Sequence, residues 1–188
     1  MTVRKHLELR GCNPNNYPCH IDEESGVCTF LLYNYMGQLV GYQQYRPRAP
    51  KAIPGTPYTR GNKPELRYWT FLAKEDKVAK RAFFGIETLD DRPFFFMVEG
   101  IFDAVKVHNA GYPCIATLSN APFHLEGFFM ISGKRVYSIS DNDKAGQHIH
   151  KFADANVKIP DGYKDVGEMP QDEVNLMLEN FLKERFIE

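Results

Sequence analysis

The chain has 188 residues, of which 43% are hydrophobic and 25% charged, and its formal net charge is -1 at pH 7. This composition is typical of a globular protein with one domain or two small lobes. No apolar run approaches the roughly 20 residues of a membrane helix. The polar start, Met1–Arg10, does not resemble a secretory signal. We therefore expect a cytoplasmic protein that makes no membrane contact.

Basic residues are concentrated in one stretch, between Arg46 and Arg81. This stretch holds ten Lys or Arg residues and only three acids, whereas the C-terminal part of the chain is acidic. Segregated charge of this kind predicts a basic surface beside an acidic site. A solvated basic loop is the alternative interpretation.

The four cysteines do not form a recognisable zinc pattern. Cys12, Cys19 and Cys28, with His20 between them, are the conceivable ligands, but no Cys-x2-Cys or Cys-x4-Cys pair is present. A cytosolic setting also makes disulfides improbable. We expect no zinc and free thiols, Cys114 included.

The N-terminal part is predicted to be rich in strands. A short helix is expected over Val3–Leu9 and ends before Gly11. Two β-rich runs, residues 26–35 and 38–45, flank a glycine-containing turn and predict a hairpin. Five prolines between residues 46 and 64 indicate a loop, and residues 67–72 form a further candidate strand.

The pattern changes after about residue 85, where apolar runs of strand length alternate with helices. We expect strands at 93–98, 113–118, 134–140 and 156–160, and helices at 101–110, from Gly146 to about 155, and at 171–185. Such alternation predicts an α/β fold, a mostly parallel sheet with helices on both faces. Residues 1–85 would form a small, basic, β-rich lobe and residues 86–188 the α/β domain.

Acidic residues follow two of the predicted parallel strands. Glu99 comes directly after the run 93–98, and Asp141 and Asp143 come directly after the run 134–140. Ligands bind beyond the carboxyl ends of such strands, which lie about 4.8 Å apart when adjacent. Three clustered carboxylates repel one another unless a cation lies between them. Oxygen-only ligands favour Mg²⁺ or Mn²⁺. Each acid taken alone is explained equally well as a helix cap.

Two segments, Val98–Asp103 (VEGIFD) and Ser140–Gly146 (SDNDKAG), resemble the two signatures of the Toprim domain, which occurs in primases, topoisomerases and some nucleases. Within that group the chain is most similar to primases, especially the polymerase part of phage primase–helicase proteins. Lys164–Glu168, Phe84-Gly85 and Gly37–Arg46 are similar to further segments of these primases. The resemblance departs from the family at Leu118-Ser119-Asn120, where a Leu-Gly turn is usual.

The resemblance implies roles for individual residues. Glu99, Asp141 and Asp143 would be the catalytic metal ligands, with Asp103 and Asp165 assisting directly or through water. The basic residues implied in nucleotide and template binding are Arg46, Lys63, Arg67 and Lys144. Tyr68 and Trp69 are candidates for stacking on a base, although core packing explains Trp69 equally well.

The function implied is synthesis of RNA primers on single-stranded DNA by nucleotidyl transfer from NTPs, with Mg²⁺ or Mn²⁺, in a bacterial or phage-infected cell. Primases of this kind commonly carry an N-terminal zinc module and act with a helicase. Neither is present in this sequence. Either a separate zinc-binding module supplies template recognition, or the sequence is an excised domain, or the protein is not a full primase. The partners expected are such a module and a replicative helicase.

Two other functions remain open. A Toprim nuclease would use the same metals to activate water and would need a general base, for which His108, His124 and His148 are candidates. His148 follows Asp143 most closely, although a solvated helix position explains it as well. A nucleic-acid-binding adaptor without catalysis is the second alternative. A topoisomerase is not expected, because it needs a separate large domain with a tyrosine nucleophile and the 188 residues given leave no room for one.

Overall fold

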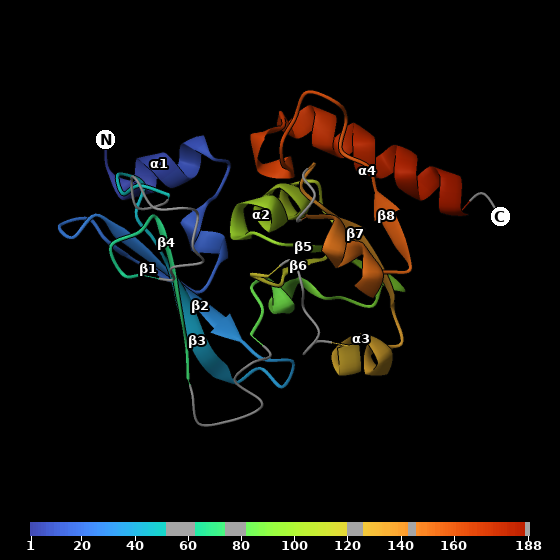
Figure 1. Cartoon of the computed structure of the whole chain (residues 1–188), viewed down its shortest axis with the longest axis horizontal. Helices are drawn as coiled ribbons and strands as arrows, with labels where there is room; N and C mark the ends of the chain where they lie inside the picture. The colour runs from blue at the N-terminus through green and yellow to red at the C-terminus, as the bar shows by residue number, and fades with distance from the viewer. Residues whose placement is uncertain (52–62, 74–81, 120–125, 143–145, 187–188) are drawn as a thin grey trace. The chain divides into compact units, whose positions relative to one another are not determined.

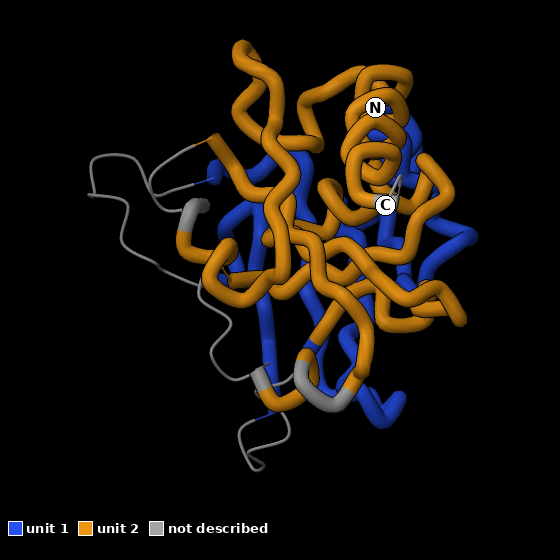
Figure 2. Tube along the Cα trace, turned by 90° about the vertical axis from the view of Figure 1, so that its right-hand side faces the viewer, with its two compact units in different colours: residues 1–82 blue, residues 83–188 orange. Residues whose placement is uncertain are grey.

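The computed structural model describes residues 1–51, 63–73, 82–119, 126–142 and 146–186 (Figure 1). The chain divides into two compact units, residues 1–82 and 83–188 (Figure 2). The sequence placed this boundary after residue 85. Within the described ranges, no helix is both long enough and apolar enough to cross a membrane.

Unit 1 is built on an antiparallel sheet with the strand order β1-β2-β3-β4. Its strands are β1 (Cys19–Asp22), β2 (Val27–Tyr33), β3 (Leu39–Tyr45) and β4 (Tyr68–Leu72). The expected hairpin and the expected fourth strand are confirmed, whereas β1 was not anticipated. Strand β4 lies at one edge of the sheet, beside β3.

Helix α1 (Val3–Leu9) packs on one face of this sheet. The Tyr45 hydroxyl lies 3.1 Å from His6 Nδ1, and Arg10 Nη1 donates to the Tyr68 hydroxyl at 2.9 Å. The carboxylate of Glu23 accepts from the first backbone N–H groups of α1. These donors have no partner inside a helix, so a carboxylate at this end stabilises it.

Unit 2 contains a parallel sheet with the order β6-β5-β7-β8. Its strands are β5 (Phe94–Val98), β6 (Cys114–Ala116), β7 (Arg135–Ile139) and β8 (Ala155–Val157). All five residues of β5 are buried, as expected for a central strand covered on both sides. The predicted α/β fold with a parallel sheet is thus confirmed.

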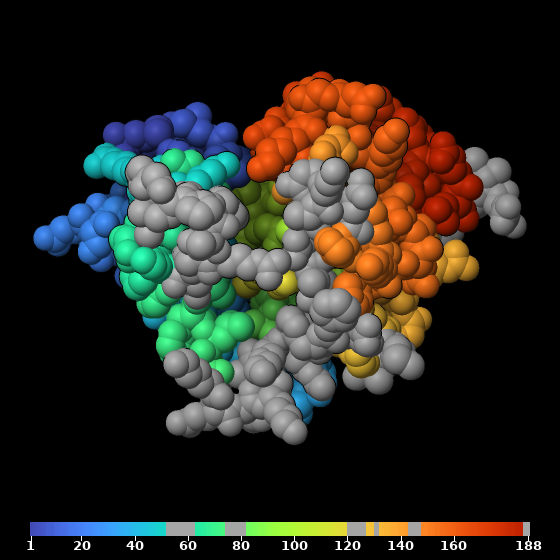
Figure 3. All heavy atoms as spheres, in the orientation of Figure 1, coloured from blue at the N-terminus to red at the C-terminus, as the bar shows by residue number. Residues whose placement is uncertain are grey.

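Helices cover both faces of this sheet (Figure 1). Phe95 packs on Phe128 of α3 (Glu126–Ser132), with ring centroids 6.1 Å apart. Its neighbour Phe96 faces the other way and packs at 6.3 Å on Phe181 of α4 (Gln171–Phe186). Helix α2 (Ile101–Asn109) contacts α4 on that side. In the space-filling view, α4 and the segment before it cover the upper part of unit 2 (Figure 3).

Four short 3₁₀ segments complete the described elements, and one corrects an expectation. They are η1 (Pro14–Asn16), η2 (Ile86–Thr88), η4 (Gly146–Phe152) and η5 (Val166–Glu168). The connection from Gly146 is therefore a 3₁₀ helix and not the expected α-helix. Helix α3 was not expected at all, because its sequence carries no capping signal that marks its start.

We expect Gly41→Ala to destabilise unit 1 by about 2–3 kcal/mol, because the added Cβ would collide with the backbone oxygen of Phe71 on the neighbouring strand. Urea unfolding followed by the fluorescence of Trp69, which lies in β4, measures this. Gly127→Ala in α3 is the matched control, since no atom lies within 4 Å of its Cβ position. Equal unfolding midpoints for wild type and Gly41→Ala would contradict the close strand packing.

Candidate functional site

Two of the predicted metal ligands, Glu99 and Asp141, lie on turns that follow neighbouring parallel strands. Glu99 follows β5 and Asp141 follows β7, and these two strands pair directly. Because the strands are parallel, both turns leave the same edge of the sheet. Asp143 and Lys144 lie outside the described residues. The structure therefore describes Glu99 and Asp141 from the predicted catalytic set.

Glu99 is half-buried, and its Oε1 atom is inaccessible to solvent. Its backbone oxygen accepts from Leu118 N at 2.9 Å, which continues the β5–β6 pairing beyond both strands. Leu118 has a φ of +58°, the one positive value among the described residues other than glycine. A left-handed leucine costs about 1–2 kcal/mol. The departure from the Leu-Gly pattern thus coincides with backbone strain beside Glu99.

Asp103 lies in the first turn of α2 and reaches a different segment of the chain. Its Oδ1 accepts from Gly167 N at 2.9 Å. Its Oδ2 lies 2.6 Å from the point where a Cβ on Gly100 would stand. Glycine at position 100 therefore lets the carboxylate of Asp103 turn back against the start of its own helix.

Asn142 ties the turn after β7 to the same distant segment. Its backbone N–H donates to Lys164 O at 2.9 Å, and its side-chain amide donates to Tyr163 O at 2.9 Å. Asp165 follows directly and caps η5, since its Oδ1 accepts from Glu168 N at 3.0 Å. Residues 163–168 are thus joined to the β7 turn by Asn142 and to α2 by Asp103.

These contacts connect the three acid-bearing parts of unit 2, but they do not bring three ligands together. Among the described residues, no three His, Cys, Asp or Glu side chains lie close enough to hold a metal ion. Asp143 is outside those residues, so the predicted cluster stays a prediction. The donors that are described are carboxylate oxygens, which suit a hard divalent ion better than zinc.

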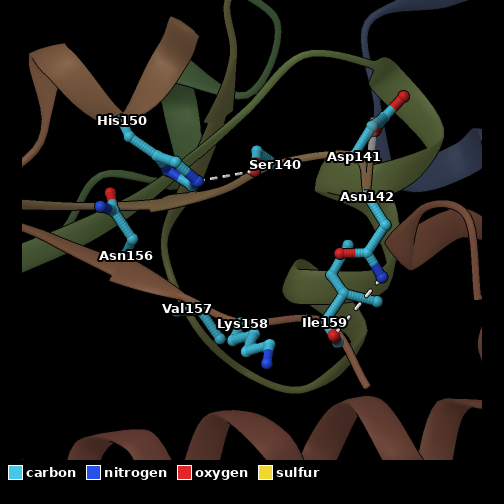
Figure 4. A pocket seen from close by; sticks show the side chains of 8 residues that line it. All are labelled: Ser140, Asp141, Asn142, His150, Asn156, Val157, Lys158 and Ile159. Carbon is cyan, nitrogen blue, oxygen red and sulfur yellow. Dashed lines mark hydrogen bonds between the residues drawn. The ribbon is translucent and has the colours of Figure 1, made fainter. Parts of the chain in front are cut away.

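A polar cavity of about 310 Å³ adjoins the turn that carries Asp141 (Figure 4). His150 of η4 lies at its wall and bridges two hydroxyls, one in β7 and one directly after it. Its Nδ1 lies 2.9 Å from Ser138 Oγ, and its Nε2 lies 2.9 Å from Ser140 Oγ. Ser138 also donates to Asn156 Oδ1. The remaining residues of the wall are Asp141, Asn142, Val157, Lys158 and Ile159.

The hydrogen bonds of this network define its proton positions. Because Ser138 gives its single hydroxyl proton to Asn156, its oxygen accepts from His150 Nδ1–H. The neutral imidazole therefore accepts from Ser140 at Nε2. Burial lowers the pKa of His150 below the 6.5 of a free histidine, which favours this neutral form.

Sequence reasoning missed Asn142, His150, Ser138, Ser140 and Asn156. Ser138 of β7 and Ser140, directly after it, are buried, at 0% and 6% exposure, among mostly apolar neighbours. Two hydroxyls on one face of a buried strand require polar partners. That pattern could have pointed to a bridging residue on the following segment, but not to which of its histidines.

Of the three histidines proposed as nuclease bases, the structure places His108 away from the acids. His108 Nε2 bonds Cys114 O at 2.8 Å, at the amino end of β6 and thus away from the acids, and burial lowers its pKa. His148 is exposed on η4. His124 lies outside the described residues.

The predicted basic ligands of unit 1 differ in their surroundings. Arg67 Nε donates to Ala49 O at 2.9 Å, which gives it a structural role in the loop after β3. Arg46 is half-buried, and Lys63 is exposed. Tyr68 faces α1 through its bond to Arg10, so it does not lie on the same face of the sheet as Trp69.

Replacing His150 with Gln should lower the free energy of unfolding of unit 2 by roughly 1–3 kcal/mol at pH 8, because two buried hydroxyls lose a partner. A histidine whose pKa is lowered by folding contributes stability above about pH 6.5 that is lost as the pH falls below it. The variant should therefore lose less stability than wild type between pH 7 and pH 5.

Urea unfolding curves of unit 2 across this pH range, monitored by far-UV circular dichroism, measure both effects. His148→Gln is the matched control on the same 3₁₀ segment and should change neither. Parallel pH profiles for wild type and His150→Gln would argue against a half-buried neutral imidazole.

Comparison with solved structures identifies the fold. The chain is similar to the Aquifex aeolicus primase (zinc-binding and RNA polymerase domains), with a TM-score of 0.57, 17% identity, and coverage of 95% of this chain and 47% of that one. It is also similar to a DnaG primase catalytic domain bound to ssDNA, with a TM-score of 0.55, 17% identity and coverage of 94% and 62%.

The primase fragment of the bacteriophage T7 primase-helicase protein gives a TM-score of 0.58 at 11% identity, over 83% of this chain and 62% of that one. The chain thus has the fold of Toprim primase catalytic cores and spans between about half and two-thirds of the length of these proteins. No profile of a known protein family matches the sequence, and no curated protein does either.

Proposed function

We propose that this chain synthesises RNA primers on a single-stranded DNA template by metal-dependent nucleotidyl transfer. One observation carries the proposal. In a fold shared with primase cores, Glu99 and Asp141 leave the same edge of a parallel sheet on adjacent strands, β5 and β7. The site of the chemistry would be this edge of unit 2.

Glu99, Asp141 and Asp143 would hold Mg²⁺ or Mn²⁺, with Asp103 and Asp165 as further or water-mediated ligands. When bound, such an ion polarises phosphate oxygens and offsets the charge that develops as a 3′-hydroxyl attacks. Asp103 and Asp165 each use one oxygen on a backbone N–H, which fixes their orientation. Fixed carboxylates lower the cost of assembling the site when substrate arrives.

Basic side chains would bind the phosphates of the triphosphate and the template that the metal ions do not contact. Lys144 lies next to Asp143 in the sequence and is proposed to contact the incoming triphosphate. Arg46, Lys63 and Arg67 are proposed to contact triphosphate or template, because they supply positive charge in unit 1. This electrostatic contribution would weaken as salt is raised.

Template recognition and unwinding would come from partners. The Aquifex structure includes a zinc-binding domain, and the T7 fragment comes from a primase-helicase protein. We propose that a zinc-binding module and a replicative helicase act with this chain. The reaction would take place where DNA and NTPs are present, in the cytoplasm of a bacterial or phage-infected cell.

We expect Asp141→Asn to lower the rate of primer synthesis by at least about 100-fold while the fold is retained, because the loss of a ligand charge removes several kcal/mol of transition-state stabilisation. Formation of labelled oligoribonucleotides from NTPs on single-stranded DNA with Mg²⁺ or Mn²⁺ measures this. Asp161→Asn is the matched control, since Asp161 is an exposed acid on the turn after β8.

Other outcomes select a different function. Degradation of the DNA without synthesis, lost in Asp141→Asn, would identify a nuclease. If neither synthesis nor degradation occurs after a zinc-binding primase module is added, the chain would be a nucleic-acid-binding adaptor without catalysis. Full primer synthesis by Asp141→Asn would overturn the assignment of the site.

A further inference from the structure

Three aromatic rings pack on one another across one face of the sheet in unit 1. Tyr42 of β3 stacks on Phe71 of β4, with ring centroids 5.2 Å apart and an angle of 21° between the rings. Trp69 meets Tyr42 edge-on at 5.6 Å. The register pairs Tyr42 with Phe71 and Gln44 with Trp69, so these side chains point to the same side of the sheet. We call Tyr42, Trp69 and Phe71 the aromatic face.

The aromatic face is partly open to solvent. Phe71 is 44% exposed, and Tyr42 and Trp69 are half-buried. Strand β4 forms the edge of its sheet. Edge strands are commonly protected from wrong pairing by charged side chains or proline. Neighbouring aromatic side chains that are exposed on an edge strand instead indicate an interaction surface.

A positive charge lies at one end of the aromatic face. The pairing of β3 with β4 continues past the strands, because Arg46 N donates to Arg67 O at 2.9 Å. Alternation therefore places Arg46 on the side of Tyr42, about 13 Å further along the strand. Among the described residues, no carboxylate pairs with Arg46, and its buried Nη1 has no acceptor. The charge of this half-buried side chain can therefore attract an anionic group from outside the chain.

We propose that the aromatic face is a stacking platform for single-stranded nucleic acid, with bases on its rings and a phosphate on Arg46. Rings beside an unneutralised guanidinium match the alternation of bases and phosphates in a single strand. The bases of a duplex are already stacked and would not bind in this way. The inference rests on the proposed function, which identifies the single-stranded nucleic acid as template DNA. It adds where on unit 1 the template binds and by which contacts.

The aromatic face contains its own reporter, because Trp69 is the only tryptophan of the chain. Titration with oligothymidylate, in EDTA and without NTPs, should quench Trp69 fluorescence to saturation. Phe71→Leu removes the ring but keeps an apolar side chain, and we expect it to weaken binding roughly tenfold. Phe71→Tyr keeps the ring and should retain the affinity.

Salt dependence separates the two contributions. Arg46→Gln should reduce the slope of log Kd against log salt by about one phosphate contact, whereas Phe71→Leu should leave the slope unchanged. Leu176→Ala, at an exposed apolar residue of α4, is the control and should alter neither affinity nor slope. Circular dichroism of each variant confirms that the sheet is intact.

Three results would overturn the inference. The first is unchanged Trp69 emission when anisotropy shows that the oligonucleotide is bound, and the second is no oligonucleotide binding at all. The third is Trp69 emission that depends on protein concentration in the absence of DNA, which would mean that a second copy of the chain covers the aromatic face. Failure of the proposed function is distinguishable. If oligothymidylate quenches Trp69 fluorescence but no primers are made, the proposed function fails and the stacking platform stands. If primers are made while Trp69 fluorescence does not respond to oligothymidylate, the proposed function stands and the platform fails.

Discussion

The hydrogen bonds from Asp103 and Asn142 to residues 163–168 are the contacts on which the candidate metal centre depends. Asp103 belongs to α2, which starts just after Glu99, and Asn142 directly follows Asp141. One short segment therefore fixes two acid-bearing turns that lie far apart in the sequence. Because the partners are mostly backbone groups, the arrangement does not require a bound ion. Such preorganisation is what positions reacting groups within the narrow tolerance of catalysis.

A polar network at the end of β7 stabilises the turn that carries Asp141. His150 joins Ser138 and Ser140 of β7, and Asn156 of β8 extends the network to the neighbouring strand. Apolar residues would fill this space with less desolvation cost. Hydrogen-bonded hydroxyls, unlike apolar side chains, restrict the turn to one geometry, because any other geometry of the turn would leave a buried donor unsatisfied. The stability of the strand end and the direction of Asp141 are thus coupled.

The sheet of unit 1 is used differently on its two faces. One face is closed by α1 and the residue that follows it. The Tyr45 hydroxyl bonds His6, and Arg10 donates to the Tyr68 hydroxyl and lies over the Tyr45 ring. The other carries the aromatic face and remains partly solvated. An antiparallel sheet tolerates this asymmetry because its strands alternate between two sides, whereas the parallel sheet of unit 2 is covered on both. A lobe with one closed and one open face is suited to binding an extended chain.

The sequence by itself determined the elements and the chemistry at their ends. Hydrophobic periodicity predicted β2 to β8 to within a few residues, since strand length is a local property. The acids after β5 and β7 predict a metal site at the carboxyl ends of these strands, and that site stays a prediction. Only the tertiary structure decided which groups orient those acids. Asn142 and His150 act through residues distant in sequence or on another element, and such contacts leave no local pattern. Likewise, the β3–β4 register alone placed Trp69 on Tyr42, because a shift of one residue would reverse the faces.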